Sequence, residues 1–197
     1  MKKMFTLILI VLVSLTSVAM AAKKPIKIAR LPIIVQKNVL DYETSSTLEM
    51  KLARAVNIPM NKTLKIAEYL PPKESSIVFG EIWHEMYNQD KKSKMSEAVK
   101  IFAEDTNADL IICPILNQYS QSVINSNISF ESHLSSFVSA EMIIYDKKTG
   151  DLIDKKTTRR YNDSFNRLGT ASYLAGECFD QLIKDTGLRQ IIRSKRG

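Results

Sequence analysis

The amino-acid sequence predicts a single α/β domain, in which helices pack over a mixed sheet of about four strands. Two observations predict this class. Helical patterns separate an apolar strand near the N-terminus from the apolar strand 110–116, which is typical of a parallel pair with a helical crossover. Residues 137–161 then carry two strand patterns around a tight turn, which predicts an antiparallel hairpin.

Residues 1–21 are predicted to be a signal peptide. Lys2 and Lys3 precede an apolar run over 5–15, and the small residues Ala19 and Ala21 occupy the positions that signal peptidase reads. The run is shorter than the roughly 20 residues that span a membrane, although an uncleaved anchor remains an alternative. We therefore expect one domain over residues 22–197, periplasmic or extracellular after cleavage.

The first elements of this domain are predicted from short patterns. Residues 26–36 are apolar and β-branched, so they predict a buried strand, and Pro32 places its second half at a bulge or an edge. Ser46 and Glu49 have the spacing of a capping box, which predicts that a helix starts at Ser46. Residues 61–70 predict a short helix capped by Asn61.

From Lys73 the pattern is helical again. Its apolar side chains form a broad face that another element must cover: Val78, Phe79, Ile82, Trp83, Met86 and Tyr87. A second helix begins near Met95 and turns at 107–109 into strand 110–116.

The remaining chain predicts strands, a turn and a final helix. The serine-rich residues 118–136 predict a polar strand extension and a loop, and 137–145 alternate as a half-buried strand does. Gly150 supplies the positive φ of a bulged turn. The return strand 152–161 is polar, as an edge strand would be. A helix over 166–185 follows.

Positive charge is concentrated at the C-terminal end. The full chain has a net charge of +7, and removal of residues 1–21 takes two lysines with it. The excess lies after residue 146, including a predicted basic tail over 188–197. Two interpretations remain: attraction to an anionic membrane, wall polymer or acidic partner, or a solvated strand and tail. The candidate interaction surface consists of Lys155, Lys156, Arg159, Arg160 and Tyr161. Because an exported protein rarely meets nucleic acid, we expect no nucleic-acid partner.

Catalytic motifs are not found. The six glycines are scattered, which argues against a nucleotide-binding loop, and no Gly-x-Ser-x-Gly occurs. Glu81 and His84 form a single Glu-x-x-His, which is typical of a solvated helix face when it stands alone. We therefore assign no catalytic residue, metal or cofactor, and expect a protein that is not an enzyme.

The two cysteines, Cys113 and Cys178, both fall on buried faces of predicted elements. An oxidising compartment would allow them to form a disulfide. The alternative is two separate buried thiols that pack as small apolar side chains.

The order of these elements resembles the small α/β domain of bacterial envelope proteins. Examples are the curli-secretion lipoproteins, the penicillin-binding-protein activator lipoproteins and the N-terminal domain of the Tol-system propeller protein. The resemblance covers about 26–186 and is carried by Leu31-Pro32-Ile33, Asn107-Ala108-Asp109 and Asp146 to Gly150. The chain departs from the pattern in two ways. It lacks the cysteine that lipid attachment requires, and Asn107 stands where glycine is usual.

The resemblance implies a non-catalytic domain that binds other envelope proteins. The leading hypothesis is therefore an exported accessory or assembly factor that acts through protein–protein contacts, at strand 152–161 and the segment 118–136. The alternative is an exported hydrolase that acts on cell-wall material through carboxylates that the sequence does not single out.

Overall fold

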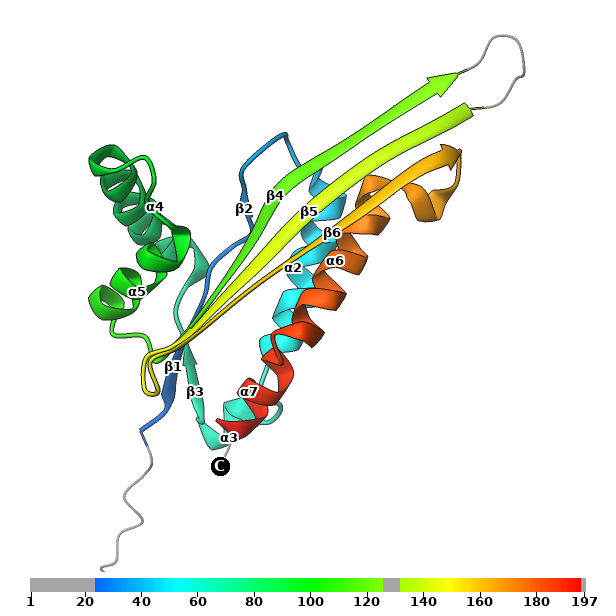
Figure 1. Ribbon diagram of the computed structural model, residues 1–197. Coiled ribbons are helices and arrows are strands. Elements are labelled where there is room, and N and C mark those ends of the chain that lie inside the picture. The colour runs from blue at the N-terminus through cyan, green and yellow to red at the C-terminus, as the bar shows by residue number, and fades with distance from the viewer. Residues whose placement is uncertain (1–23, 126–131, 196–197) are drawn as a thin grey trace, which may run out of the picture.

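The computed structural model describes residues 24–125 and 132–195, which form a six-stranded mixed sheet with helices on both faces (Figure 1). The strand order is β3-β1-β4-β5-β6, and β2 also pairs with β4. The strands are β1 (Ile26–Arg30), β2 (Ile34–Val35), β3 (Ala67–Tyr69), β4 (Leu110–Asn125), β5 (Ser132–Asp146) and β6 (Asp151–Ser164). The helices are α2 (Tyr42–Val56), α3 (Asn61–Leu64), α4 (Pro72–Gln89), α5 (Met95–Thr106), η1 (Arg167–Gly169), α6 (Ala171–Asp185) and α7 (Leu188–Ser194). The predicted α/β class is confirmed, but the prediction of about four strands is wrong.

The predicted N-terminal strand is split into two pieces at Pro32. β1 and β2 both pair with β4 in parallel, with Ile28 opposite Leu110 and Ile34 opposite Ile115. The predicted parallel pair is therefore confirmed. The break exposes the backbone N–H of Ile33, which donates to Glu49 Oε1 at 2.9 Å, and the same carboxylate pairs with Arg30.

The N-cap of helix α2 lies five residues earlier than the capping box predicted. Asp41 is the N-cap, and its side chain accepts from the backbone N–H of Thr44 at 2.8 Å. That hydrogen bond holds the pKa of Asp41 below its ordinary value. The predicted cap at Ser46 is wrong, because Glu49 bonds to Arg30 and Ile33 instead of returning to Ser46.

A third parallel strand replaces the second half of the helix predicted over 61–70. Helix α3 ends at Leu64 after one turn, and β3 pairs with β1, with Ile26 opposite Ala67. The side chain of Asn61 bonds to both the N–H and the C=O of Ala67, at 2.7 and 2.8 Å. These bonds fix the start of β3.

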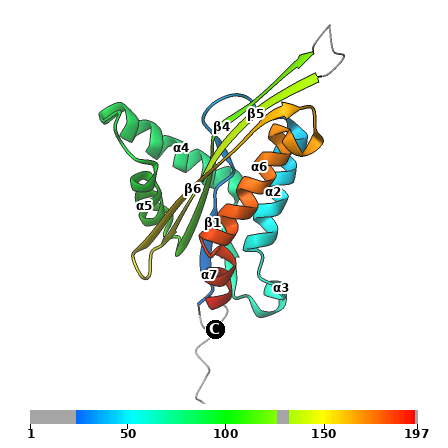
Figure 2. The same cartoon turned by 45° about the vertical axis from the view of Figure 1, so that its right-hand side comes forward.

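The core consists of two layers of apolar side chains, one on each face of the sheet. Helices α2, α6 and α7 cover one face, and α4 and α5 cover the other (Figures 1 and 2). Within the basic tail predicted over 188–197, residues 188–194 form helix α7. Leu188 and Ile192 lie one helical turn apart in this helix, and both are buried.

Strands β4, β5 and β6 form a long antiparallel meander that extends past the helices (Figure 1). The turn between β5 and β6 contains Gly150 at φ 76°, as predicted. A bulge at Asn117 shifts the register of β4. Before the bulge, the even-numbered residues of β4 face α2 and α6. After the bulge, the odd-numbered residues Tyr119 and Gln121 face these helices.

Candidate docking edge on strand β6

Strand β6 forms one edge of the sheet and is 14 residues long. The N–H of Phe165, just after the strand, donates to the C=O of Ser132 at 2.8 Å. Hydrogen bonding alternates along an antiparallel pair, so the odd-numbered residues of β6 direct their backbone groups at β5. The even-numbered residues, Thr158 among them, therefore direct their N–H and C=O groups outward. We call this row the β6 edge.

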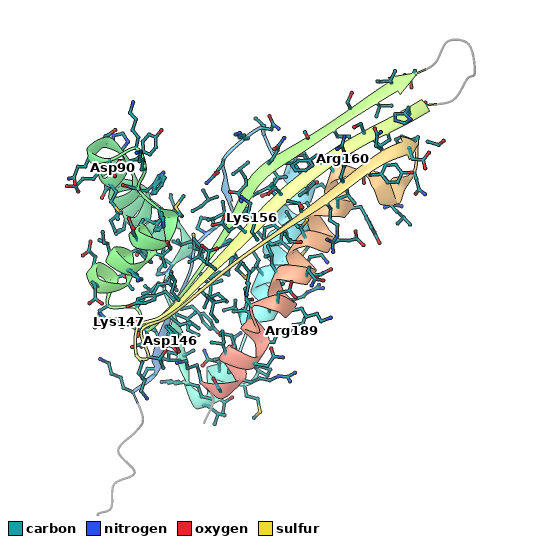
Figure 3. The ribbon with its side chains drawn as sticks, in the orientation of Figure 1. Asp90, Asp146, Lys147, Lys156, Arg160 and Arg189 are labelled. Atoms are coloured by element: carbon teal, nitrogen blue, oxygen red, sulfur yellow. The ribbon has the colours of Figure 1, made fainter. Side chains whose placement is uncertain are left out.

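The centre of the β6 edge is basic on both faces of the sheet. Lys156 and Arg160 lie on the face that carries α4 and α5, along the strand in Figure 3, whereas Lys155 and Arg159 lie on the opposite face. Among the described residues, none of these four side chains forms an ion pair. The charges of Lys155, Arg159 and Arg160 are therefore available to a partner, whereas Lys156 lies opposite Glu141 and also lowers the pKa of Asp154. All four basic residues lie within the surface that the sequence predicts.

Tyr161, the fifth residue of the predicted surface, belongs partly to the core. Its ring is half-buried against the α6 layer, and its hydroxyl donates to the C=O of Ser164 at 2.8 Å. A Cβ on Gly169 would lie 2.3 Å from the Tyr161 ring. The tyrosine thus holds η1 against β6, and its close approach requires glycine at position 169.

Gly169→Ala is expected to lower the free energy of unfolding by about 1–3 kcal/mol, because the ring or the backbone must move. Gly176→Ala is the matched control, since its nearest neighbour is the Lys51 side chain at 3.6 Å and alanine favours the interior of helix α6. Urea unfolding followed by circular dichroism measures both. Equal stability of the two variants would contradict the packing of Tyr161 on Gly169.

One pair of acidic side chains lies beside the β6 edge, and the sequence analysis missed it. Burial raises the pKa of Asp154, and the charge of Glu141 on the neighbouring strand adds to the rise. Glu141 also accepts from Asn117 Nδ2 at 3.0 Å. Strand register brings these residues together, and counting residues outward from the predicted turn at Gly150 could have placed them near each other. Neither acid lines either of the two cavities described for this chain.

The segment 118–136 is mostly strand. β4 continues to Asn125 and β5 begins at Ser132, so both strands are longer than predicted. Residues 126–131 lie outside the described part of the chain. Leu134 and Ser136 are buried there on the α6 face, so only part of this segment is a surface.

The two cysteines are free thiols on opposite faces of the sheet. Cys113 packs with the α4 and α5 layer, whereas Cys178 lies in α6 under the other face. The disulfide between them is therefore not formed, and the alternative of two separate buried thiols holds. Burial raises the pKa of Cys113, and it raises the pKa of Cys178 to about 11.

No metal-binding cluster of three or more suitable side chains occurs among residues 24–125 and 132–195. His84, on α4, lies 3.0 Å from the side chain of Asn88. Within the same ranges, none of the helices has the length and apolar character needed to cross a membrane.

Comparison with known proteins gives structural matches only. No family model and no curated protein matches this sequence. The fold is similar to that of lipoprotein GNA1162 from Neisseria meningitidis, at 13% identity, TM-score 0.38 and coverage of 81% of this chain and 99% of that one. It is also similar to hypothetical protein CT253 from Chlamydia trachomatis, at 11% identity, TM-score 0.46 and coverage of 84% and 99%. The C-terminal domain of LpoB from Salmonella enterica matches at 10% identity, TM-score 0.32 and coverage of 69% and 83%. These matches are likenesses of fold to three solved bacterial proteins.

Proposed function

We propose that this protein is an exported, non-catalytic accessory factor of the bacterial cell envelope, and that it binds a partner protein at the β6 edge. The observation that carries the proposal is the 14-residue edge strand, with four basic side chains that have no ionic partner within the described ranges. The predicted signal peptide supports the location.

An extended segment of the partner would add a strand to the sheet. Backbone hydrogen bonds to the outward groups of β6 supply affinity in this mode, and side chains supply specificity. Residues 155–160 contain four positive charges and no negative one. The partner segment is therefore expected to carry acidic side chains opposite them.

The rival proposal, a hydrolase acting on cell-wall material, would need two acids that work together in a cleft. Asp154 has a raised pKa and lies near Glu141, but neither lines a described cavity, and both lie on the sheet face beside the edge. This placement favours binding over catalysis at that position.

Thr158→Pro tests the binding mode. Proline removes an outward N–H and obstructs an added strand, whereas the bonds of β6 to β5 are made by its odd-numbered neighbours. Thr158→Ala is the matched control, because it changes the side chain and keeps the backbone donor. Each variant is immobilised and exposed to envelope extract, and the captured proteins are quantified.

We expect a stoichiometric partner with wild type and Thr158→Ala, and at least a tenfold lower yield with Thr158→Pro. Capture of the same partner in equal amount by Thr158→Pro would overturn strand addition at this edge. Absence of any stoichiometric partner would overturn the binding function itself.

A further inference from the structure

A second surface lies at the end of the molecule where β1 begins. There the start of β1, the connection from α3 to β3, the turn between β5 and β6 and the end of α7 line a cavity of about 970 Å³. Ile26, Leu64 and Ile66 contribute apolar walls, and Lys24, Lys65 and Lys148 contribute positive charge. We call this the β1-end cavity. It is separate from the basic centre of the β6 edge.

Three lysines of the cavity have no ion-pair partner within residues 24–125 and 132–195. Lys24, Lys65 and Lys148 are exposed, and none forms an ion pair with another described residue. Lys195 also lines the cavity and pairs with Asp146. The acid in the wall, Asp109, accepts from the backbone N–H of Lys27 at 2.7 Å. An anion entering here would meet the three unpaired ammonium groups, which outnumber the single carboxylate of Asp109 in the wall.

The apolar walls limit what that anion can be. Leu64 keeps 59% of its surface exposed, while Ile26 and Ile66 are half-buried and pack on the α2 and α6 layer. A small inorganic anion would leave these side chains facing water, and a neutral amphiphile would leave the lysines without a partner. A ligand with both an anionic and an apolar part satisfies both halves of the cavity.

Lys65 also occupies an unfavourable backbone conformation. Its φ of 48° and ψ of 44° lie in the left-handed region, where glycine or asparagine costs less. Its backbone N–H donates to the C=O of Asn61 at 2.8 Å and ends α3. A lysine in this conformation destabilises the fold, and its side chain lines the cavity. Strained residues of this kind are commonly found at binding sites.

We propose that the β1-end cavity binds an anionic phospholipid, with the phosphate at the three lysines and the glycerol and first acyl carbons against Ile26, Leu64 and Ile66. Basic residues attract anionic headgroups, and the apolar contacts add to that attraction. The site would hold this end of the domain against a bilayer and leave the β6 edge available to a protein partner.

A nuclear magnetic resonance titration of the purified full chain tests this. The probes are dihexanoyl phosphatidylglycerol below its micelle-forming concentration, the matching phosphatidylcholine, and inorganic phosphate. We expect saturable shifts at Ile66 and Lys148 with phosphatidylglycerol, and at least tenfold weaker binding of the other two. The phosphatidylcholine arm tests the need for charge, and the phosphate arm tests the need for the apolar part.

Two double variants locate the charge. Lys65→Glu with Lys148→Glu is expected to weaken phosphatidylglycerol binding at least tenfold. Lys155→Glu with Lys156→Glu changes the net charge by the same amount on β6, and it should leave lipid binding unchanged. The second variant should instead reduce capture of the protein partner, so failure of either proposal can be recognised separately. The single variant Lys148→Gln, at an exposed turn residue, provides a milder test with a smaller loss.

Several results would overturn the proposal. These are no saturable binding of phosphatidylglycerol, equal affinity for phosphatidylcholine, equal affinity for inorganic phosphate, or equal losses in the two double variants. The last result would mean that net charge attracts the lipid without a defined site.

Discussion

Phe102→Ala is expected to lower the free energy of unfolding by about 3–5 kcal/mol. Phe102 is fully buried in α5, and its ring meets that of Phe79 edge to face, with centroids 5.7 Å apart and an interplanar angle of 78°. Phe79 is the one large apolar residue of α4 that is buried, and Val78, Ile82, Trp83 and Met86 pack beside it with part of their surface exposed. Removal of the Phe102 ring leaves a cavity between α5 and α4.

Urea unfolding measures the loss, and amide hydrogen exchange shows where it acts. We expect the exchange of α4 to accelerate more than that of α2. Ile101→Ala is the control, because Ile101 is the adjacent residue and keeps 42% of its surface exposed. Its expected effect is below about 1 kcal/mol. If the two variants unfold at the same urea concentration, Phe102 does not anchor the layer.

Glu49→Ala is expected to lower the free energy of unfolding by about 2–3 kcal/mol. Loss of one member of a buried ion pair costs about 3–5 kcal/mol, and partial exposure of this pair reduces the effect. The side chains of Arg30 and Glu49 are 18% and 28% exposed. The variant would leave Arg30 without its carboxylate and the N–H of Ile33 without its acceptor. The segment between β1 and β2 would lose its attachment to α2.

Glu49→Gln separates these two contributions. The amide keeps an oxygen acceptor for Ile33 but loses the charge, so an intermediate loss is expected in thermal unfolding. Glu43→Ala, an exposed acid in the first turn of the same helix, is the control for charge. An effect of Glu49→Ala no larger than that of Glu43→Ala would show that this ion pair does not stabilise the fold.

The sequence predicted the elements whose patterns are long and local. The crossover into Leu110, the alternation over 137–145 and the turn at Gly150 each rest on several adjacent residues that favour one structure. β3 was missed because three residues, Ala67 to Tyr69, are too few to show alternation, and the strand forms only by pairing with β1. Likewise Ser46 and Glu49 fit a local capping box, but a distant partner, Arg30, takes the carboxylate.

The candidate sites were predictable to different degrees. The basic residues of the β6 edge are contiguous in the chain, so their position on a polar return strand was visible in the sequence. The β1-end cavity draws its lysines from positions 24, 65 and 148, and only the sheet topology brings them together. The two cysteines were each correctly expected to be buried. Which face each one occupies depends on how the helices cross the sheet.

The bulge at Asn117 also limits how the long hairpin can vary in evolution. Beyond it, side chains alternate between the two faces with a period of two. Insertion or deletion of one residue between the bulge and Asn125 would turn Tyr119 and Gln121 away from α6, or displace the residues that follow them. A change of two residues in each strand would preserve every inward side chain. Homologous chains are therefore expected to differ in hairpin length by even steps, or to carry a second bulge that restores the phase.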